Sequence, residues 1–402
     1  MHVKRIVQLR VAAILIVVWT VSAAHAVYRG DEFEPRDYNV GNTFFINRAM
    51  IRQGTENWDR FERATNAFIG SAGSLSSTDL YLHQQLKVRH PLEGAFAFQA
   101  DYLRDRDFDG VFHRFTLGLE YRLSPEWAVE LVGEPLPDKE HADIGGAVSR
   151  RGDLVYWRFQ WLFPDFVFDS KNPDNARMER SAPNFQFDAR YQPAPQWDFR
   201  LHADFDPARR LVNPEESFQF RFRKYQMTLD ARYRVSEAEE LRASVEGEYS
   251  RQLREGLETN DPRDFQTDRD YLMGTLEYLR RLEQDTHFRA GGIYVRLDEL
   301  NDFPNNLEES LLLDRHDNML YAGRSWPLRD RIHFNSFVIV NVLSMRKIRE
   351  DPDESASFNR FLGRAAGSIV FLGPQYNIEA GGAVSLDRTR FGGGFARVFV
   401  DF

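Results

Sequence analysis

The sequence of 402 residues contains no cysteine. This absence excludes disulfide bonds, thiolate zinc sites, cysteine nucleophiles and a lipid-modified N-terminal cysteine. After the first 26 residues there is also no run of about 20 apolar residues, the length that a helical membrane span needs. The mean hydropathy is −0.52, so helical membrane spans are not expected.

The sequence also lacks the short motifs that identify common enzymes. It has no H-E-x-x-H metal site, no G-x-S-x-G nucleophile elbow and no glycine-rich phosphate loop. Its histidines are scattered singly. We therefore predict that the protein is not an enzyme and uses no cofactor. A hydrolase with Ser and His on neighbouring strands is a weaker alternative that sequence alone leaves open. The histidines that this alternative would draw on are His83, His113, His202, His287 and His333.

The first 26 residues have the organisation of a secretory signal peptide. Lys4, Arg5 and Arg10 form a basic region, Val11–Ala23 is a short apolar core, and residues 24–26 read Ala-His-Ala. Such a segment is too short and wrongly flanked for a membrane anchor. Removing the three cations would change the formal net charge from −9 to −12. We expect no nucleic-acid partner for a chain this acidic.

Aromatic residues are abundant, at 14% of the chain, and 33 of them are Phe. From Leu80 onward, runs of about ten residues alternate between apolar and polar side chains, as strands with one apolar face do. In "HRFTLGLEYRL", for example, Phe115, Leu117 and Leu119 share one face, whereas the residues between them are mostly polar. A hydrophilic average combined with many aromatics is typical of a lipid-facing β-barrel with a polar interior.

The predicted connections between these runs alternate in length. Short ones are expected near residues 90–93, 124–126, 164–165, 192–196, 236–239, 281–285, 328–330 and 373–375. Longer polar ones are expected near residues 104–110, 136–152, 170–183, 206–216, 251–270, 298–316 and 343–356, with one tight exception near 388–390. Tight turns at one end and long loops at the other are the pattern of up-and-down outer-membrane barrels.

Aromatic residues crowd beside the predicted short turns, as in a girdle at one membrane interface. The residues assigned to this girdle are Tyr121, Trp127, Trp161, Tyr191 and Trp197.

The segment "YQPAPQW" predicts one hairpin register. If Tyr191 pairs with Trp197, Arg190 faces Asp198 and Asp188 faces Arg200. One face is then wholly apolar, and opposite charges meet on the other.

The strand count follows from the alternation. We predict about 17 strands from Leu80 to Phe402, including a short one near residues 166–169, and one more within residues 59–71, because closed single-chain barrels normally have an even number. The predicted fold is all-β: a transmembrane up-and-down antiparallel β-barrel of about 18 strands, with 16 possible. The predicted organisation is a signal peptide over 1–26, a periplasmic or plug segment over 27–58 and the barrel over 59–402.

The signal peptide, the alternating strands with interfacial aromatics and the final "ARVFVDF" together resemble the bacterial outer-membrane β-barrels. In that superfamily the barrel-assembly machinery reads a C-terminal aromatic that follows apolar residues at alternate positions. Val398, Val400 and Phe402 match this pattern. The resemblance implies a location in the bacterial outer membrane, contact with outer-membrane lipid and the assembly machinery as a partner during biogenesis.

The polar faces of the strands carry charges of both signs. A barrel of 16–18 strands is wide enough for an aqueous channel, so these residues are candidates to line a pore, where they either guide a polar solute or pair across strands and brace the wall. Neither positive nor negative charges dominate on these faces, so strong selectivity for anions or cations is not expected. The candidates are Asp101, Arg114, Glu120, Glu130, Arg158, Asp188, Arg190, Asp198, Arg200, Asp230, Arg232, Arg242 and Glu246.

The function predicted first is an outer-membrane channel for polar solutes or an exported polymer such as a polysaccharide, with periplasmic export components as possible partners. The alternative is a structural or assembly barrel that binds a partner through its N-terminal segment or its loops.

The segment "DRDFDG" is a weak calcium candidate. Asp105, Asp107 and Asp109 match the opening of a calcium loop, but Thr116 stands where the bidentate Glu is required. Asp109 and Gly110 also form an ordinary hairpin turn. We therefore predict no metal.

Overall fold

The computed structural model describes residues 67–401, except for 76–79, 93, 108–109, 135–142, 164–182, 214–217, 257–263, 283–285, 308–309, 350–355, 375 and 388–389. Within these residues there is no helix with the length and apolar character of a membrane span.

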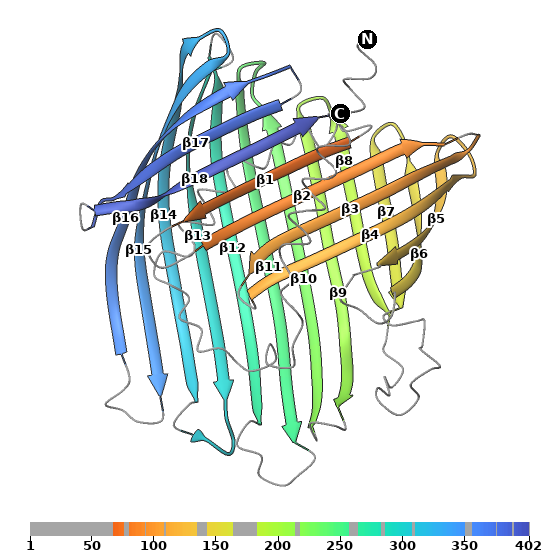
Figure 1. Cartoon of the computed structure of the whole chain (residues 1–402), viewed down its shortest axis with the longest axis vertical. Coiled ribbons are helices and arrows are strands. Elements are labelled where there is room, and N and C mark those ends of the chain that lie inside the picture. Colours follow the sequence, from red (N-terminus) through yellow and green to blue (C-terminus); the bar gives the residue numbers. More distant parts are fainter. Residues whose placement is uncertain are drawn as a thin grey trace, which may run out of the picture. The chain divides into compact units, whose positions relative to one another are not determined.

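The described residues form eighteen strands in one antiparallel sheet, shown in Figure 1. Each strand pairs with the next, and β18 pairs with β1, so that Phe68 lies opposite Asp401 and the sheet is closed. The predicted all-β up-and-down barrel is confirmed. The strands are β1 (Ala67–Leu75), β2 (Leu80–Pro91), β3 (Phe96–Asp107), β4 (Gly110–Arg122), β5 (Trp127–Glu134), β6 (Asp143–Arg151), β7 (Val155–Phe163), β8 (Asn184–Ala194), β9 (Trp197–Asn213), β10 (Phe218–Arg234), β11 (Glu239–Gly256), β12 (Phe265–Arg281), β13 (His287–Asp302), β14 (Leu311–Arg329), β15 (Ile332–Arg349), β16 (Ala356–Leu372), β17 (Tyr376–Ser385) and β18 (Arg390–Asp401).

Side chains alternate between the two faces of every strand, because successive residues of a strand point to opposite sides. β14 shows this clearly: Leu313, Arg315 and Asp317 are buried on the inner face, whereas Leu312 and Leu320 are exposed on the outer face. A closed sheet leaves no unpaired strand edge, which a strand-built membrane protein requires.

The strands differ in length around the barrel. β9 to β16 have 16–19 residues each, whereas β1 to β8 have 8–13. Figure 1 shows the long strands continuing past the short ones at the long-loop end. A 17-residue strand extends for roughly 56 Å, more than twice the apolar band of about 25 Å on such barrels.

Outward-facing aromatics form two girdles. One lies beside the short turns, where the Trp197 and Tyr233 rings are 4.4 Å apart. The second joins Phe205, Tyr225 and Tyr249, with centroid distances of 6.2 and 6.3 Å. Along β9 and β10 the girdles are eight residues apart, roughly 26 Å measured along a strand. This spacing matches a membrane-spanning apolar band.

The sequence predicted only the girdle at the short turns. The assignment of Trp161 to this girdle is wrong. β7 follows a tight turn at residues 152–154, so Trp161 lies near its other end, opposite Phe185. Phe185 in turn lies opposite Phe205 of the second girdle. The other predicted girdle residues lie beside short turns: Tyr121, Trp127, Tyr191 and Trp197.

The predicted connection after β5 is also wrong. The long loop expected over 136–152 contains β6, whose sequence "DIGGAVSRR" offers little contrast between apolar and polar positions. Gly146 of this strand makes room for Trp161, because a Cβ there would lie 2.7 Å from the indole. β7 pairs directly with β8. The short turn expected at 164–165 and the strand expected at 166–169 lie outside the described residues.

The loop predicted at 104–110 is a tight hairpin instead. Asp107 lies opposite Gly110, with only residues 108–109 between the two strands. Asp105 is part of the β3–β4 ladder. The segment "DRDFDG" therefore belongs to a β-hairpin, as the second interpretation of this segment expected. Asp109 lies outside the described residues.

The predicted register of the β8–β9 hairpin is wrong by two residues. Tyr191 lies opposite Phe199, and the register shifts between Tyr191 and Ala194. A shift of two residues keeps every side chain on its predicted face but changes its partner, so Arg190 lies opposite Arg200.

The two ends of the barrel match the predicted strand directions. β1 occupies part of the range in which an additional strand was predicted. Val398 is exposed on the outer face of β18, whereas Phe402 and the predicted segments 1–26 and 27–58 lie outside the described residues.

Barrel closure can be tested by a designed disulfide between β1 and β18. Ser71 lies opposite Val398, and directly opposed Cβ atoms approach the separation that a disulfide spans. Because the chain has no cysteine, S71C/V398C is expected to oxidise to one intramolecular bond that changes the mobility of the unfolded chain on non-reducing gels.

The matched control is S71C/V400C, because Val400 lies opposite Ile69 and not Ser71. Equal cross-linking of both pairs, or of neither, would contradict this β1–β18 register.

Candidate functional site

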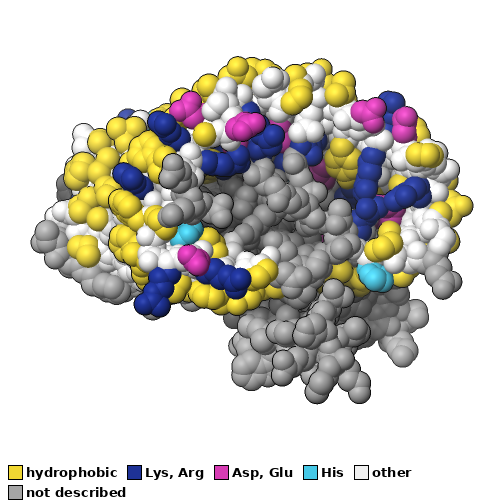
Figure 2. Space-filling view, turned by 90° about the horizontal axis from the view of Figure 1, so that it is seen from above, with side chains coloured by type: hydrophobic (Ala, Val, Ile, Leu, Met, Phe, Trp, Pro, Cys, Tyr) yellow, Lys and Arg dark blue, Asp and Glu magenta, His cyan; other side chains and the backbone are white. Residues whose placement is uncertain are grey.

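The inner face of the barrel carries the candidate site. The predicted pore-lining residues with described side chains all lie on this face: Asp101, Glu120, Glu130, Arg158, Asp188, Arg190, Asp198, Arg200, Asp230, Arg232, Arg242 and Glu246. The side chain of Arg114 lies outside the described part of the structure. Seen from the short-turn end, Lys and Arg side chains gather around the rim of the opening (Figure 2).

Glu130 and Arg158 form an ion pair across β6. Arg158 Nε and Nη2 donate to the same oxygen of Glu130 at 3.0 and 2.8 Å. Small neighbours make the contact possible, because a Cβ on Gly118 would lie 1.9 Å from Glu130 Oε1. The pair braces the wall, which is the structural role considered for these charges from sequence.

The charges of β8 and β9 are paired but remain in contact with water. Asp198 accepts hydrogen bonds from Arg190 at 2.9 Å and from Arg200 at 3.4 Å. Asp188 contacts His202 Nδ1 at 2.7 Å, and these two side chains are 37% and 38% exposed. Asn184, Gln186 and Asp204 on the same face are also partly exposed. We call the inner face of β8 and β9 the water-exposed wall.

The chain of polar contacts becomes buried from β10 to β14. Arg232 lies 2.9 Å from Glu240, with side-chain exposures of 1% and 4%. Glu240 also binds Arg242, which lies 3.7 Å from Glu277. Glu277 accepts a hydrogen bond from the Tyr321 hydroxyl at 3.0 Å.

Further ion pairs lie fully buried on the inner face of β12 to β15. Arg269 donates to Glu299 at 2.8 Å. Arg315 donates to Asp317 at 2.7 Å, and Asn341 donates to the same carboxylate at 2.6 Å. These residues were not among the candidates predicted from the sequence, although opposite charges two positions apart on a strand, as in "RHD", share a face.

Apolar side chains pack around these buried pairs, all on the inner face. They are Tyr271, Ile293, Val295, Leu297, Leu313, Met319, Tyr321, Ile339, Leu343, Met345, Leu362, Ala366 and Ala383. We call this inner face of β12 to β17 the packed wall. The polar interior expected from the sequence is therefore found on only part of the inner face.

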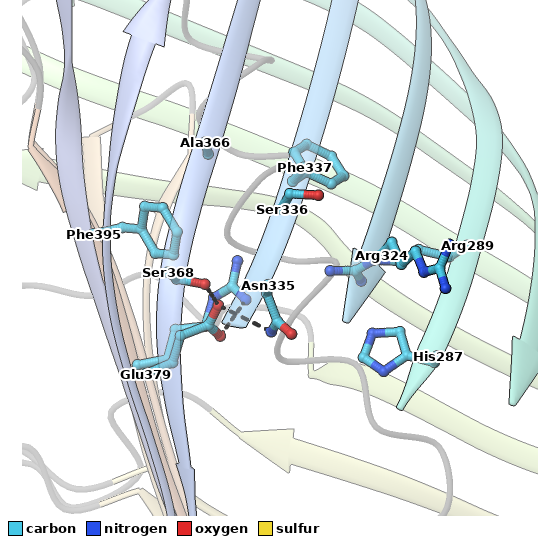
Figure 3. A pocket seen from close by; sticks show the side chains of 11 residues that line it. His287, Arg289, Arg324, Asn335, Ser336, Phe337, Ala366, Ser368, Glu379 and Phe395 are labelled. Carbon is cyan, nitrogen blue, oxygen red and sulfur yellow. Dashed lines mark hydrogen bonds and ion pairs between the residues drawn. The ribbon is translucent and has the colours of Figure 1, made fainter. Parts of the chain in front are cut away.

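A small polar recess lies at the edge of the packed wall and is lined by residues of β13 to β18 (Figure 3). Glu379 is its only carboxylate among the described lining residues, and it accepts hydrogen bonds from Ser368, from Arg397 at 2.8 Å and from Asn335 at 3.5 Å. Arg289 stacks on the Phe337 ring at 5.6 Å.

The recess brings Ser and His side chains near one another without pairing them. Ser368 donates to Glu379, whereas His287 lies on the far side of the recess (Figure 3). A nucleophilic serine needs a base within hydrogen-bonding reach. The arrangement is therefore suited to holding a polar group and not to activating a serine.

The Glu130–Arg158 pair, whose side chains are only 7% and 16% exposed, should matter for stability. Removing one partner leaves an uncompensated buried charge, so E130A or R158A should lower the free energy of unfolding by about 3–5 kcal/mol. The reversed pair, E130R/R158E, should recover part of this loss. Denaturant unfolding followed by tryptophan fluorescence measures the effect.

The exposed pair Glu126–Arg150, at 3.2 Å and about half exposed, is the matched control. E126A should change the stability by less than about 1 kcal/mol. If E130A were equally mild, the wall-bracing role of Glu130 would be wrong.

Comparisons with known proteins give structural similarity only. No family model and no curated protein matches the sequence. The chain is similar to Pseudomonas aeruginosa OpdL, with a TM-score of 0.41, 10% identity and coverage of 84% of this chain and 96% of that one. It is similar to a bacterial polysaccharide outer membrane secretin, with a TM-score of 0.39, 11% identity and coverage of 84% and 99%. It is also similar to a loop-deletion variant of OmpT, an outer membrane protein of Vibrio cholerae, with a TM-score of 0.39, 8% identity and coverage of 83% and 97%.

Proposed function

We propose that the protein is a non-enzymatic channel of the bacterial outer membrane that admits small polar solutes along its water-exposed wall. The observation that carries the proposal is the exposure of paired charges inside a closed barrel. Asp188 and His202 are more than one-third exposed on the inner face, whereas the outer face between the two girdles is apolar.

A mixed-charge wall suits a passive channel. Arg200, Asp188 and His202 can each exchange a protein partner or a water for a group of the passing solute, so that entry and exit cost little free energy. Paired charges also bind a solute weakly, because each charge is already partly neutralised by its partner.

The packed wall favours small solutes over an exported polymer. Apolar side chains and buried ion pairs occupy the inner face of six of the eighteen strands, which narrows the space left for a passing chain. The alternative of an assembly barrel depends on the N-terminal segment or the loops as its binding surface. The exposed inner charges instead favour transport.

Purified protein in planar bilayers should produce stepwise conductance. Replacing both exposed residues, D188W/H202W, should lower the single-channel conductance roughly twofold or more, because indole rings would fill the hydrated strip. The control is L229W, which places the same ring on the outer face of β10, where Leu229 is exposed.

Folding of all three proteins is checked by their heat-modifiable migration on gels. An intact wild-type barrel without conductance would contradict the channel. Equal conductance of D188W/H202W and wild type would contradict the assigned path.

A further inference from the structure

Five strands end in arginine at the short-turn end of the barrel: Arg329 of β14 lies opposite Ile332 beyond a register shift, and the other four share one place in their hairpins. Arg122, Arg151, Arg234 and Arg281 are the last residues of β4, β6, β10 and β12. Each occupies the same place in its hairpin, since its backbone N–H donates to a carbonyl oxygen of the preceding short turn, at 2.9, 2.7, 2.8 and 2.7 Å respectively. The register puts all four on inner-face positions, opposite Ala128, Tyr156, Glu240 and His287.

The four side chains are exposed at the rim of the barrel. The side chains of Arg151 and Arg281 are 44% and 45% exposed. Arg122 and Arg234 are also exposed. Figure 2, which views this end, shows both basic and acidic side chains around the opening. Arg190 of β8, partly exposed on the same face, lies between the pair from β4 and β6 and the pair from β10 and β12.

The inner-face carboxylates at this level are buried, so they contribute little to the exposed charge. Glu120, Asp198 and Glu240 are each less than one-tenth exposed. Each is held by an arginine of the wall: Arg89 lies 2.5 Å from Glu120, Arg190 lies 2.9 Å from Asp198, and Arg232 lies 2.9 Å from Glu240. The rim arginines Arg151 and Arg281 reach Glu120 and Glu240 only at 3.6 and 3.8 Å.

Carboxylates of the short turns are drawn to the outer face. Glu126 accepts hydrogen bonds from outward-facing Arg150 at 3.2 Å. Glu239 accepts a hydrogen bond from Tyr278 at 2.9 Å and lies 3.8 Å from Arg280. Asp153 and Glu237 remain exposed in the turns. Among the described inner-face residues at these strand ends, the exposed charges are therefore basic.

We propose that Arg122, Arg151, Arg234 and Arg281 form an anion-attracting ring at the short-turn mouth, so that the channel prefers anionic solutes such as small carboxylates. A mouth of one charge sign raises the local concentration of oppositely charged solute, and guanidinium groups match carboxylates with paired hydrogen bonds. This inference rests on the proposed channel function. It differs from the expectation of weak selectivity drawn from the sequence, because burial and pairing, and not the number of charges, decide which sign meets the solute.

The test is the reversal potential of single channels in an asymmetric KCl gradient. The wild type should favour chloride over potassium at roughly 0.1 M salt and lose the preference near 1 M, because the Debye length falls from about 10 Å to about 3 Å. The variant R122Q/R151Q/R234Q/R281Q should conduct with its chloride preference reduced at least about twofold, since four of the charges that focus anions are gone.

The matched control is R150Q/R280Q, which removes two exposed arginines at the same level from the outer face. It should keep the wild-type reversal potential. Conductance without chloride preference in the wild type, or an unchanged preference in the quadruple variant, would overturn the ring while leaving the channel in place. An intact barrel with no conductance would overturn both.

Sodium acetate and sodium gluconate in place of KCl extend the test to carboxylates. Acetate should carry current in the wild type and less in the quadruple variant. If chloride passes but acetate is excluded, the assignment of carboxylates as solutes is wrong.

Discussion

The two-residue period of a closed antiparallel sheet is the constraint on which the rest of this structure depends. Once β18 pairs with β1, every side chain between them faces either lipid or the interior. A slip of one residue would turn Arg158 or Arg315 toward lipid, where an arginine near the bilayer midplane costs about 2–4 kcal/mol. The charges inside the barrel therefore help to specify the register as well as line the interior.

The same constraint produces two different interiors. On β12 to β17, inward apolar side chains surround Arg269, Arg315 and their partners, so this side behaves like the core of a soluble protein. On β8 and β9, most inward residues pair with one another and keep contact with water, as Asp188 and His202 do. A barrel of eighteen strands is wide enough for both arrangements, and the proposed channel rests on the second.

The sequence predicted the parts of the fold that depend on period and count. The alternation of apolar and polar residues around Glu120 and Arg158 correctly predicted which side chains face the interior. The expectation of an even number of strands predicted one more strand before Leu80. β6 was not predicted because its glycine and alanine residues show no alternation between apolar and polar side chains. These small residues make room for the indole of Trp161 on the next strand. The β8–β9 register was wrong because the turn chemistry around Pro193 shifts the ladder by two residues. The second girdle was missed because Tyr225 and Tyr249 lie within long strands, away from any turn signal.

The charge that meets a solute was not predictable, because it depends on which carboxylates are buried by partners far along the chain. Glu120 is held by Arg89, 31 residues earlier, and a sequence shows neither contact nor burial. The most direct test of the account is cysteine accessibility in the membrane-embedded, otherwise cysteine-free barrel. A membrane-impermeant thiol reagent should label D188C and H202C, and should leave the outward L201C and the packed-wall S325C unlabelled. Labelling of L201C, or equal labelling of S325C and H202C, would contradict a barrel with one water-exposed wall and one packed wall.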